Sequence, residues 1–295
     1  MWIKKDLIIE PQHNLWWMKT HAMLPTVEHI SGDTYRVYFS GRDETNVSHI
    51  GYAEVEVADG AMKVLGYNPD PVFSPGERGC FDDNGVTPSC IVGDKLYYIG
   101  WNSGTTTYRM SLIMGIATES SSGFERTSRA PLLKRTDREP FGICTAPFVL
   151  KEETGYKMWY VSGEGWRDRD TPLYNIKVAT SLNGLDWTQT GRVAIDLNPG
   201  ETALARPCVV KDEYGYHMYF SYKVPAVGYR IGYAHSNDGL DWTRGEHLEV
   251  DTSSTSRWDN EMVEYSYVFV HKNFTYMLYN GNNYGATGIG YAVQR

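Results

Sequence analysis

The fold is decided by the stretch Leu204-Ala205-Arg206-Pro207-Cys208-Val209-Val210, which is followed by Tyr216-His217-Met218-Tyr219-Phe220-Ser221 and by Ile231-Gly232-Tyr233-Ala234. β-Branched and aromatic residues favour strands, whereas the Gly and Asp residues between the runs favour turns. The stretch therefore predicts a proline-led apolar strand, then an aromatic strand, then a Gly/Ala strand.

The same unit occurs five times along the chain. Its central aromatic residues stand 60 or 61 residues apart, at Tyr38, Tyr98, Trp159, Tyr219 and Tyr279. Prolines open the first strand in four copies, at Pro25, Pro88, Pro147 and Pro207, and the fifth copy begins without proline near Ser266. No segment shows a sustained helical period. The repeats predict an all-β, five-bladed β-propeller of four-stranded antiparallel blades.

The chain ends after the third strand of the fifth copy, and the run from Ile3 to Ile9 precedes the first copy. We expect this N-terminal strand to close the ring as the outer strand of blade five, which also covers an edge. The prediction is one domain over residues 1–295, with blades at about 20–70, 80–130, 140–193, 200–250, and 258–295 plus 2–9. The hairpins at Ser181–Trp187 and Ser236–Trp242 share the pattern S-x-[ND]-G-L-D-W and are interpreted as structural turns.

Composition excludes several classes of function. The 295 residues carry a net charge of −8 without a Lys/Arg run, so no nucleic-acid partner is expected. No apolar window is long enough for a membrane span and the N-terminus lacks a signal-peptide core, which favours a cytoplasmic location. The four cysteines lack metal-site spacing and are expected to be buried free thiols. We expect neither a metal nor a cofactor, and the oligomeric state stays open.

In a propeller, the loops that lead into the first strands converge on one face with the loops that join second to third strands. Tryptophan can stack on sugar C–H surfaces there, while Asn, acidic and basic side chains hydrogen-bond hydroxyls. The candidate substrate-binding residues in these loops are Trp17, His21, Arg42, Trp101, Asn102, Glu164, Trp166, Arg206, Lys223, Tyr229, Glu261 and Asn282.

Carboxylates recur at one position of these loops. Asp82, Glu201 and Glu261 each lie about six residues before the start of a first strand. They could point together into one axial pocket, or they could simply face water. Arg206 occupies the position before the blade proline, where the other proline-bearing copies have neutral residues. Its guanidinium could hold a carboxylate or phosphate, or form a structural ion pair.

The strand openings Thr87-Pro88, Ala146-Pro147-Phe148-Val149 and Arg206-Pro207 resemble those of the five-bladed propeller glycosidase superfamily. That superfamily includes glycoside hydrolase families 43, 62, 32, 68, 117 and 130, and no single family matches best. The resemblance covers essentially the whole chain. It implies a carbohydrate substrate and cleavage of a glycosidic bond by carboxylate acid/base catalysis at the channel mouth.

The chain departs from this pattern at one important position. The resemblance to family 43 places the base Asp just before the first blade proline, where this chain has Leu24. Glu264-Tyr265-Ser266 resembles the stretch that holds the acid, but it lies in blade five. The candidate catalytic residues are therefore Asp82 or Asp83 as a relocated base and Glu201 or Glu264 as the acid.

Three functions fit the sequence. The first is a glycoside hydrolase that acts on a small or acidic glycan. The second is an inorganic-phosphate-dependent glycoside phosphorylase, in which Arg206, Lys223, Arg42 and His21 would cradle phosphate. The third is a carbohydrate-binding propeller without catalytic activity, which the missing carboxylate at Leu24 favours.

Overall fold

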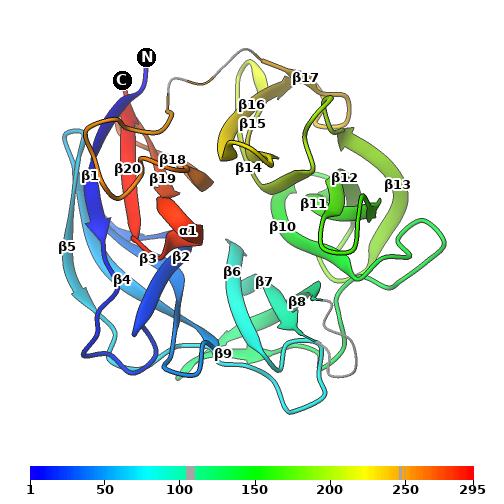
Figure 1. Ribbon diagram of the computed structural model, residues 1–295, viewed down its shortest axis with the longest axis horizontal. Coiled ribbons are helices and arrows are strands. Elements are labelled where there is room, and N and C mark those ends of the chain that lie inside the picture. The colour runs from blue at the N-terminus through cyan, green and yellow to red at the C-terminus, as the bar shows by residue number, and fades with distance from the viewer. Residues whose placement is uncertain (104–109, 246–247, 249) are drawn as a thin grey trace.

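The computed structural model describes residues 1–103, 110–245, 248 and 250–295. Strands dominate this part of the chain, and its one helical segment is the short α1 (Asn282–Gly285). The strands form four-stranded antiparallel groups that surround a central axis, as Figure 1 shows. The predicted all-β class with antiparallel strands is thus confirmed.

Successive strands along the chain pair with one another, and we number the resulting groups in chain order. Group 1 contains β2 (Thr20–Ser31), β3 (Thr34–Arg42), β4 (Ser48–Ala58) and β5 (Ala61–Tyr67). Group 2 contains β6 (Gly85–Val92), β7 (Lys95–Asn102), β8 (Ser111–Ser120) and β9 (Gly123–Arg126). Group 3 contains β10 (Ile143–Glu152), β11 (Gly155–Trp166), β12 (Pro172–Ser181) and β13 (Trp187–Ile195). Group 4 contains β14 (Ala203–Asp212), β15 (Gly215–Val224), β16 (Gly228–Ser236) and β17 (Thr243–Arg244).

Group 5 is built from both ends of the chain. It contains β18 (Glu264–His271), β19 (Phe274–Asn280), β20 (Ile289–Gln294) and β1 (Ile3–Ile9). Strand β1 lies antiparallel to β20, with Lys4 opposite Ala292. Figure 1 shows both termini beside this group. The predicted position of the N-terminal strand, outermost in the last group, is confirmed.

Backbone pairing does not run around a closed ring, which corrects the sequence-based expectation. Groups 1 to 4 form one sheet through short parallel bridges, such as Ser48 with Gly85, whereas group 5 forms a separate four-stranded sheet. Groups 5 and 1 are instead joined by side-chain contacts. The Tyr35 hydroxyl lies 2.9 Å from His271 Nδ1, and Tyr267 donates to the carbonyl of Val27.

The two S-x-[ND]-G-L-D-W hairpins are structural turns, as predicted. Ser181 Oγ accepts hydrogen bonds from the backbone N–H groups of Asn183 and Gly184, and Gly184 has a φ of 74°. Trp187 then donates its indole N–H to the Gly184 carbonyl and packs edge-on against Tyr97 of group 2. The second hairpin repeats these bonds from Ser236 to Trp242.

The core follows the repeat. The aromatic residues of the second strands are mostly buried, with Trp159 and Tyr279 completely enclosed. Three of the four cysteines are buried free thiols, as expected, whereas Cys80 is partly exposed. Burial raises the pKa of the Cys90 and Cys208 thiols to about 12, so both are protonated and unreactive at neutral pH.

Candidate active site

A cavity of about 590 Å³ lies on the central axis. Its walls include residues of all five groups, among them Leu24, Trp101, Ala146, Lys223 and Tyr265. A volume of this size fits a small ligand such as a sugar of a few residues. The convergence of the first strands on the axis therefore creates one shared pocket.

A bulge in the first strand shapes the cavity wall. The pairing register of the first and second strands shifts at this point in every group. In four groups the residue at the bulge adopts a left-handed conformation, with φ of 54° at Leu24, 46° at Ala146, 50° at Arg206 and 56° at Tyr265. All four of these residues line the cavity. Such backbone strain in non-glycine residues is concentrated at functional sites.

Arg206 is fully buried at the inner end of the cavity. Its Nη1 donates to the carbonyl of Pro88 at 2.7 Å, and its Nη2 donates to the carbonyl of Pro25 at 2.6 Å and to Thr26 Oγ1 at 2.9 Å. The side chain thus crosses the axis from group 4 to groups 1 and 2. Burial lowers the pKa of this guanidinium. The sequence left two alternatives for Arg206, anion binding or a structural ion pair. The contacts fit a structural role, but the partners are backbone carbonyls and not a carboxylate.

Glu264 is the buried acid beside the cavity. Neither of its carboxyl oxygens completes a hydrogen bond with the residues that the structure describes. Burial raises the pKa of Glu264 well above its usual range, and the positive charge of Lys223 and the nearby backbone N–H of Tyr284 oppose this shift only in part. Burial therefore favours the protonated form of this carboxyl.

Tyrosine side chains lie beside Glu264, which is fully buried. Tyr229 and Tyr265 have ring centroids 5.6 Å apart, and Tyr284 meets Tyr229 edge-on at 6.2 Å. The hydroxyls of Tyr174 and Tyr229 share a hydrogen bond of 2.8 Å. We call Tyr174, Tyr229, Tyr265 and Tyr284 the tyrosine wall. All four line the cavity, and their rings offer the flat apolar faces on which sugars stack.

His21 is half-buried near the rim, next to Arg42. Burial and the charge of Arg42 lower the pKa of His21 to about 4. The imidazole is therefore neutral at pH 7 and adds no positive charge for a phosphate. It was predicted to bind substrate, but it does not line the cavity.

The lowered pKa of His21 predicts that the free energy of unfolding depends on pH. Between pH 6.5 and 4 the unfolded chain binds a proton at this residue and the folded protein does not, so stability falls as the pH falls through this window. After allowance for solvent access, we expect a loss of about 1 kcal/mol. Urea unfolding of wild type and His21→Asn at pH 4.5 and pH 7 measures it, and equal pH slopes would contradict the prediction.

The recurring carboxylates of the leading loops bind within their own groups. In group 2, Asp82 accepts hydrogen bonds from the Tyr98 hydroxyl at 3.0 Å and from Arg126 at 2.8 Å. In group 4, Glu201 forms a bidentate ion pair with Arg244 at 2.7 and 2.8 Å. We call such a carboxylate, held by a cation of the third or the outermost strand of its own group, a carboxylate latch.

Groups 3 and 5 contain the same carboxylate latch. Glu139 accepts from the Tyr160 hydroxyl at 2.8 Å and lies 3.5 Å from Lys177. Asp259 accepts from the Tyr279 hydroxyl at 3.1 Å and pairs with Lys4 of β1 at 2.6 Å.

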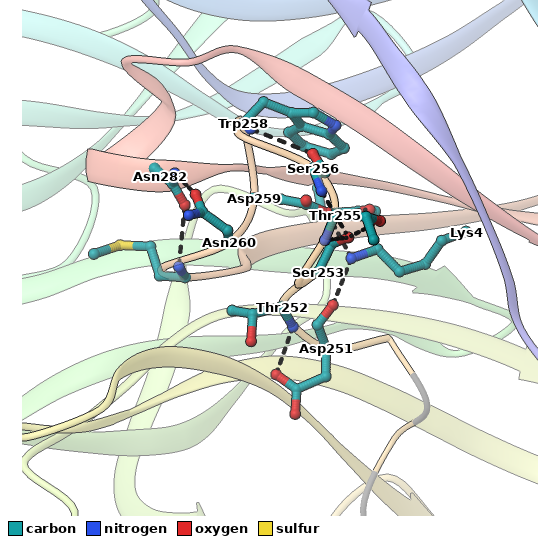
Figure 2. A network of polar contacts seen from close by, with 12 residues as sticks. Lys4, Asp251, Thr252, Ser253, Thr255, Ser256, Trp258, Asp259, Asn260 and Asn282 are labelled. Carbon is teal, nitrogen blue, oxygen red and sulfur yellow. Dashed lines mark hydrogen bonds and ion pairs between the residues drawn. The ribbon is translucent and has the colours of Figure 1, made fainter.

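Figure 2 shows how the latch of group 5 holds its loop. Lys4 Nζ also donates to the carbonyl of Asp251 at 2.5 Å, so one side chain fastens both ends of the loop 251–259. On the other side of the loop, Asn282 of α1 donates to Asn260 at 2.7 Å.

The latches correct the expectation that repeated carboxylates share an axial pocket. Asp82 and Glu201 are held inside their groups and do not line the cavity, and neither does Glu261. Asp83 also lies outside it, where it accepts from the Gly79 N–H and from the Asn102 side chain, both at 2.8 Å. None of the four candidate catalytic carboxylates lines the cavity, and Glu264 alone lies beside the tyrosine wall.

The predicted binding residues divide in the same way. The structure brings five of them together on the cavity wall, namely Arg42, Trp101, Arg206, Lys223 and Tyr229. Trp17 instead is completely buried beneath Gly51 and Phe39, so it cannot stack on a ligand. Asn102 holds a loop, and Asn282 donates to and accepts from its neighbouring loop. Glu164 pairs with Lys177 at 2.8 Å. Trp166 packs beside the cavity without lining it.

Sequence reasoning missed Tyr174, Tyr265 and Asp170, which all line the cavity. A signal for Tyr265 was present, because it occupies the same repeat position as Leu24 and Arg206. The fifth copy lacks the proline that marks this position in the other four copies, so Tyr265 does not stand out in the sequence. Asp170 lies in the loop between β11 and β12, where no repeat position marks it.

Among the described residues, no helix is long and apolar enough to cross a membrane. Within the same part of the chain, no three His, Cys, Asp or Glu side chains are grouped so that they could hold a metal ion.

Comparison with solved structures identifies proteins of the same fold. A glycoside hydrolase matches with a TM-score of 0.72 and 19% identity over 99% of this chain and 91% of its own. A thermostable family-43 glycoside hydrolase matches with a TM-score of 0.67 and 15% identity, covering 94% and 89%. The β-1,2-mannobiose phosphorylase of Listeria innocua, in complex with β-1,2-mannobiose, has a TM-score of 0.67 at 11% identity, covering 94% and 90%. The chain has the β-propeller fold of these glycoside-active enzymes.

Sequence comparison identifies the family. "Uncharacterized protein MT1551" of Mycobacterium tuberculosis (strain CDC 1551 / Oshkosh) is 41% identical over 299 residues, which cover 99% of this chain and 98% of the relative. "Uncharacterized protein Rv1502" of strain ATCC 25618 / H37Rv is 40% identical over the same length and coverage. The chain belongs to the family of these two mycobacterial proteins. No family model matches it.

Proposed function

We propose that the chain is a single five-bladed propeller over residues 1–295, with groups 1 to 5 as its blades, and that it cleaves a glycosidic bond in the axial cavity. The likeness of the fold to glycoside hydrolases and a glycoside phosphorylase supports this proposal. The fold alone hosts several chemistries, so the function has to be argued from the site.

The observation that carries the proposal is the buried carboxyl of Glu264 beside the tyrosine wall, both of whose oxygens lack a hydrogen-bond partner among the described residues. Cleavage of a glycosidic bond requires a carboxylic acid that keeps its proton at neutral pH until the leaving oxygen takes it. Burial supplies this condition at Glu264, whose pKa is raised well above its usual range. The tyrosine wall and Trp101 provide surfaces for sugar rings in front of the acid.

In the hydrolytic reaction, Glu264 gives its proton to the glycosidic oxygen as the bond from that oxygen to the anomeric carbon breaks. A water oxygen forms the new bond to this carbon, and an ionised carboxylate takes the proton that the water loses. Asp170 is the one carboxylate on the cavity wall in the described ranges, and it is our candidate for this base.

A second candidate function is phosphorolysis, favoured by the scarcity of carboxylates on the cavity wall. Phosphate can attack the anomeric carbon without a protein base, so a single acid such as Glu264 suffices. The exposed position of Asp170 makes it a less confined base than a hydrolase normally uses. The product would then be a sugar 1-phosphate in place of a free reducing sugar.

The two reactions are separated by one assay. The purified protein is incubated with a panel of oligosaccharides and nitrophenyl glycosides, with and without inorganic phosphate, and reducing sugar and sugar 1-phosphate are both quantified. Turnover without phosphate supports hydrolysis, and turnover that requires phosphate supports phosphorolysis. Saturable sugar binding without turnover on the whole panel would overturn the proposal in favour of a carbohydrate-binding propeller.

A further inference from the structure

Partly buried cations of this protein are generally paired with carboxylates. Examples are Lys4–Asp259, Arg126–Asp82, Lys157–Glu152, Arg230–Asp251, Arg244–Glu201 and Lys177–Glu164, with distances between 2.6 and 2.9 Å. This pairing reflects the free-energy cost of removing a charge from water without a partner.

Three cations on the cavity wall depart from this rule. Arg42, Arg206 and Lys223 form no ion pair with any carboxylate in the part of the chain that the structure describes. Arg42 donates to the neutral Asn46 side chain at 3.0 Å, and Lys223 donates to the Tyr284 hydroxyl at 3.2 Å. The nearby Glu264 forms no ion pair with them, because neither of its carboxyl oxygens has a partner among the described residues and burial favours its neutral form.

These cations border one continuous surface. The ammonium of Lys223 lies over the rings of Tyr229 and Tyr284, 5.4 and 5.8 Å from their centroids. Arg42 and Arg206 are both close enough to Tyr265 to interact with it electrostatically. The tyrosine wall therefore has positive charge on either side, and burial makes that charge costly for as long as no anion is present.

We propose that the cavity takes a ligand with a fixed oxyanion, a carboxylate or a phosphate, held between Arg42 and Lys223 over the tyrosine wall. The guanidinium of Arg42 can bind two oxyanion oxygens in parallel and the Lys223 ammonium acts as a point charge. Arg206 adds positive potential, while its Nη1 and Nη2 stay bonded to backbone carbonyls and to Thr26 and its buried Nε has no partner among the described residues. The inference deepens the proposed function, on which it rests for the sugar part of the ligand.

This oxyanion has two possible sources, which share the same chemistry. It is either a substituent of the glycan, such as a uronate carboxylate or a sugar phosphate, or free inorganic phosphate that acts as a second substrate. Binding is measured by isothermal titration calorimetry at low salt with D-glucuronate, D-glucose 6-phosphate and inorganic phosphate, each compared with neutral D-glucose.

The expected result is that at least one anion binds about tenfold or more tightly than D-glucose and that added NaCl weakens it. Lys223→Gln and Arg42→Gln should each weaken that anion about tenfold. The matched control Lys95→Gln, which removes the same charge from a pair with Asp94 outside the cavity, should leave binding unchanged. Thermal melting confirms that each variant is folded.

Tight binding of phosphate by itself identifies the free-phosphate source, and binding of charged sugars alone identifies the substituent. Both results support the inference. It is overturned if no anion binds better than D-glucose, or if Lys223→Gln and Arg42→Gln, both folded, bind the anion as the wild type does.

The failure of this inference and that of the proposed function can be told apart. The titrations are repeated with Glu264→Gln, which keeps a neutral side chain of similar size. Anion binding that persists in this variant, with no turnover of any glycoside by the wild type, supports the inference and contradicts the proposed function. Turnover of neutral glycosides by the wild type without any anion binding supports the proposed function and overturns the inference.

Discussion

Replacement of Glu264 by glutamine is expected to lower kcat/KM for the cleaved glycoside about 10³-fold, because the reaction loses its proton donor. Glutamine has nearly the shape of the protonated acid that burial maintains at this position. Sugar binding and the melting temperature should therefore change little. Steady-state kinetics on the substrate found by the panel assay, with calorimetric binding of the same sugar, measure the two effects separately.

The pH profile gives the same test a second readout. Glu264 acts only while it is protonated, so wild-type kcat/KM should fall at alkaline pH as this carboxyl loses its proton, and the residual rate of Glu264→Gln should lack that decline. Asp82→Asn is the matched control, since Asp82 lies in a carboxylate latch outside the cavity. It should cost stability but keep the rate within a few-fold. A Glu264→Gln variant with wild-type turnover would exclude Glu264 as the acid.

Arg206→Met is expected to lower the free energy of unfolding by about 4 kcal/mol and the melting temperature by about 10 °C. The guanidinium donates to the carbonyls of Pro25 and Pro88, and methionine would fill its volume without replacing those bonds. Removal of a buried charge is often neutral when its partners are removed as well. Here the backbone carbonyls remain at the axis, buried and without donors, so the loss is not compensated.

The companion variant Arg206→Lys distinguishes the contribution of the positive charge to stability from that of the planar guanidinium. Lysine keeps the positive charge but cannot reach groups 1 and 2 at once with a planar fork. It should recover a minority of the lost stability in urea unfolding while preserving the positive potential of the cavity. If Arg206→Met unfolds at the wild-type temperature, the side chain does not hold the groups together.

The fold could be predicted from the sequence because its signal repeats. The aromatic positions Tyr38, Tyr98, Trp159, Tyr219 and Tyr279 keep a nearly constant spacing, and each copy adds turn residues at matching places. The sequence did not predict that group 5 forms a sheet without backbone hydrogen bonds to its neighbouring groups. Such bonds depend on how closely the strands of neighbouring groups approach, and residue types do not encode that distance.

The site was predictable only in part. Arg206, Lys223 and Tyr229 were found because propeller geometry fixes which loops face the axis. The carboxylates were the weaker part, since position along a loop does not say which way a side chain points. Asp82 and Glu201 turn toward tyrosine or arginine partners inside their own groups, and those partners lie more than fifteen residues away in sequence. Glu264 differs because its strand begins at the bulge itself, next to Tyr265.

The assembly of group 5 from both ends of the chain has a consequence for the order of folding. Strand β1 finds its partner only when β20 is in place, and the contact between Lys4 and Ala292 is among the most distant in the sequence. Contacts of this kind form late, because closing so long a loop costs entropy before it is rewarded. Strand β1 stays the outermost strand of group 5 in the folded protein, and the exposed charges of Lys5 and Asp6 disfavour pairing of this edge with the strands of other chains.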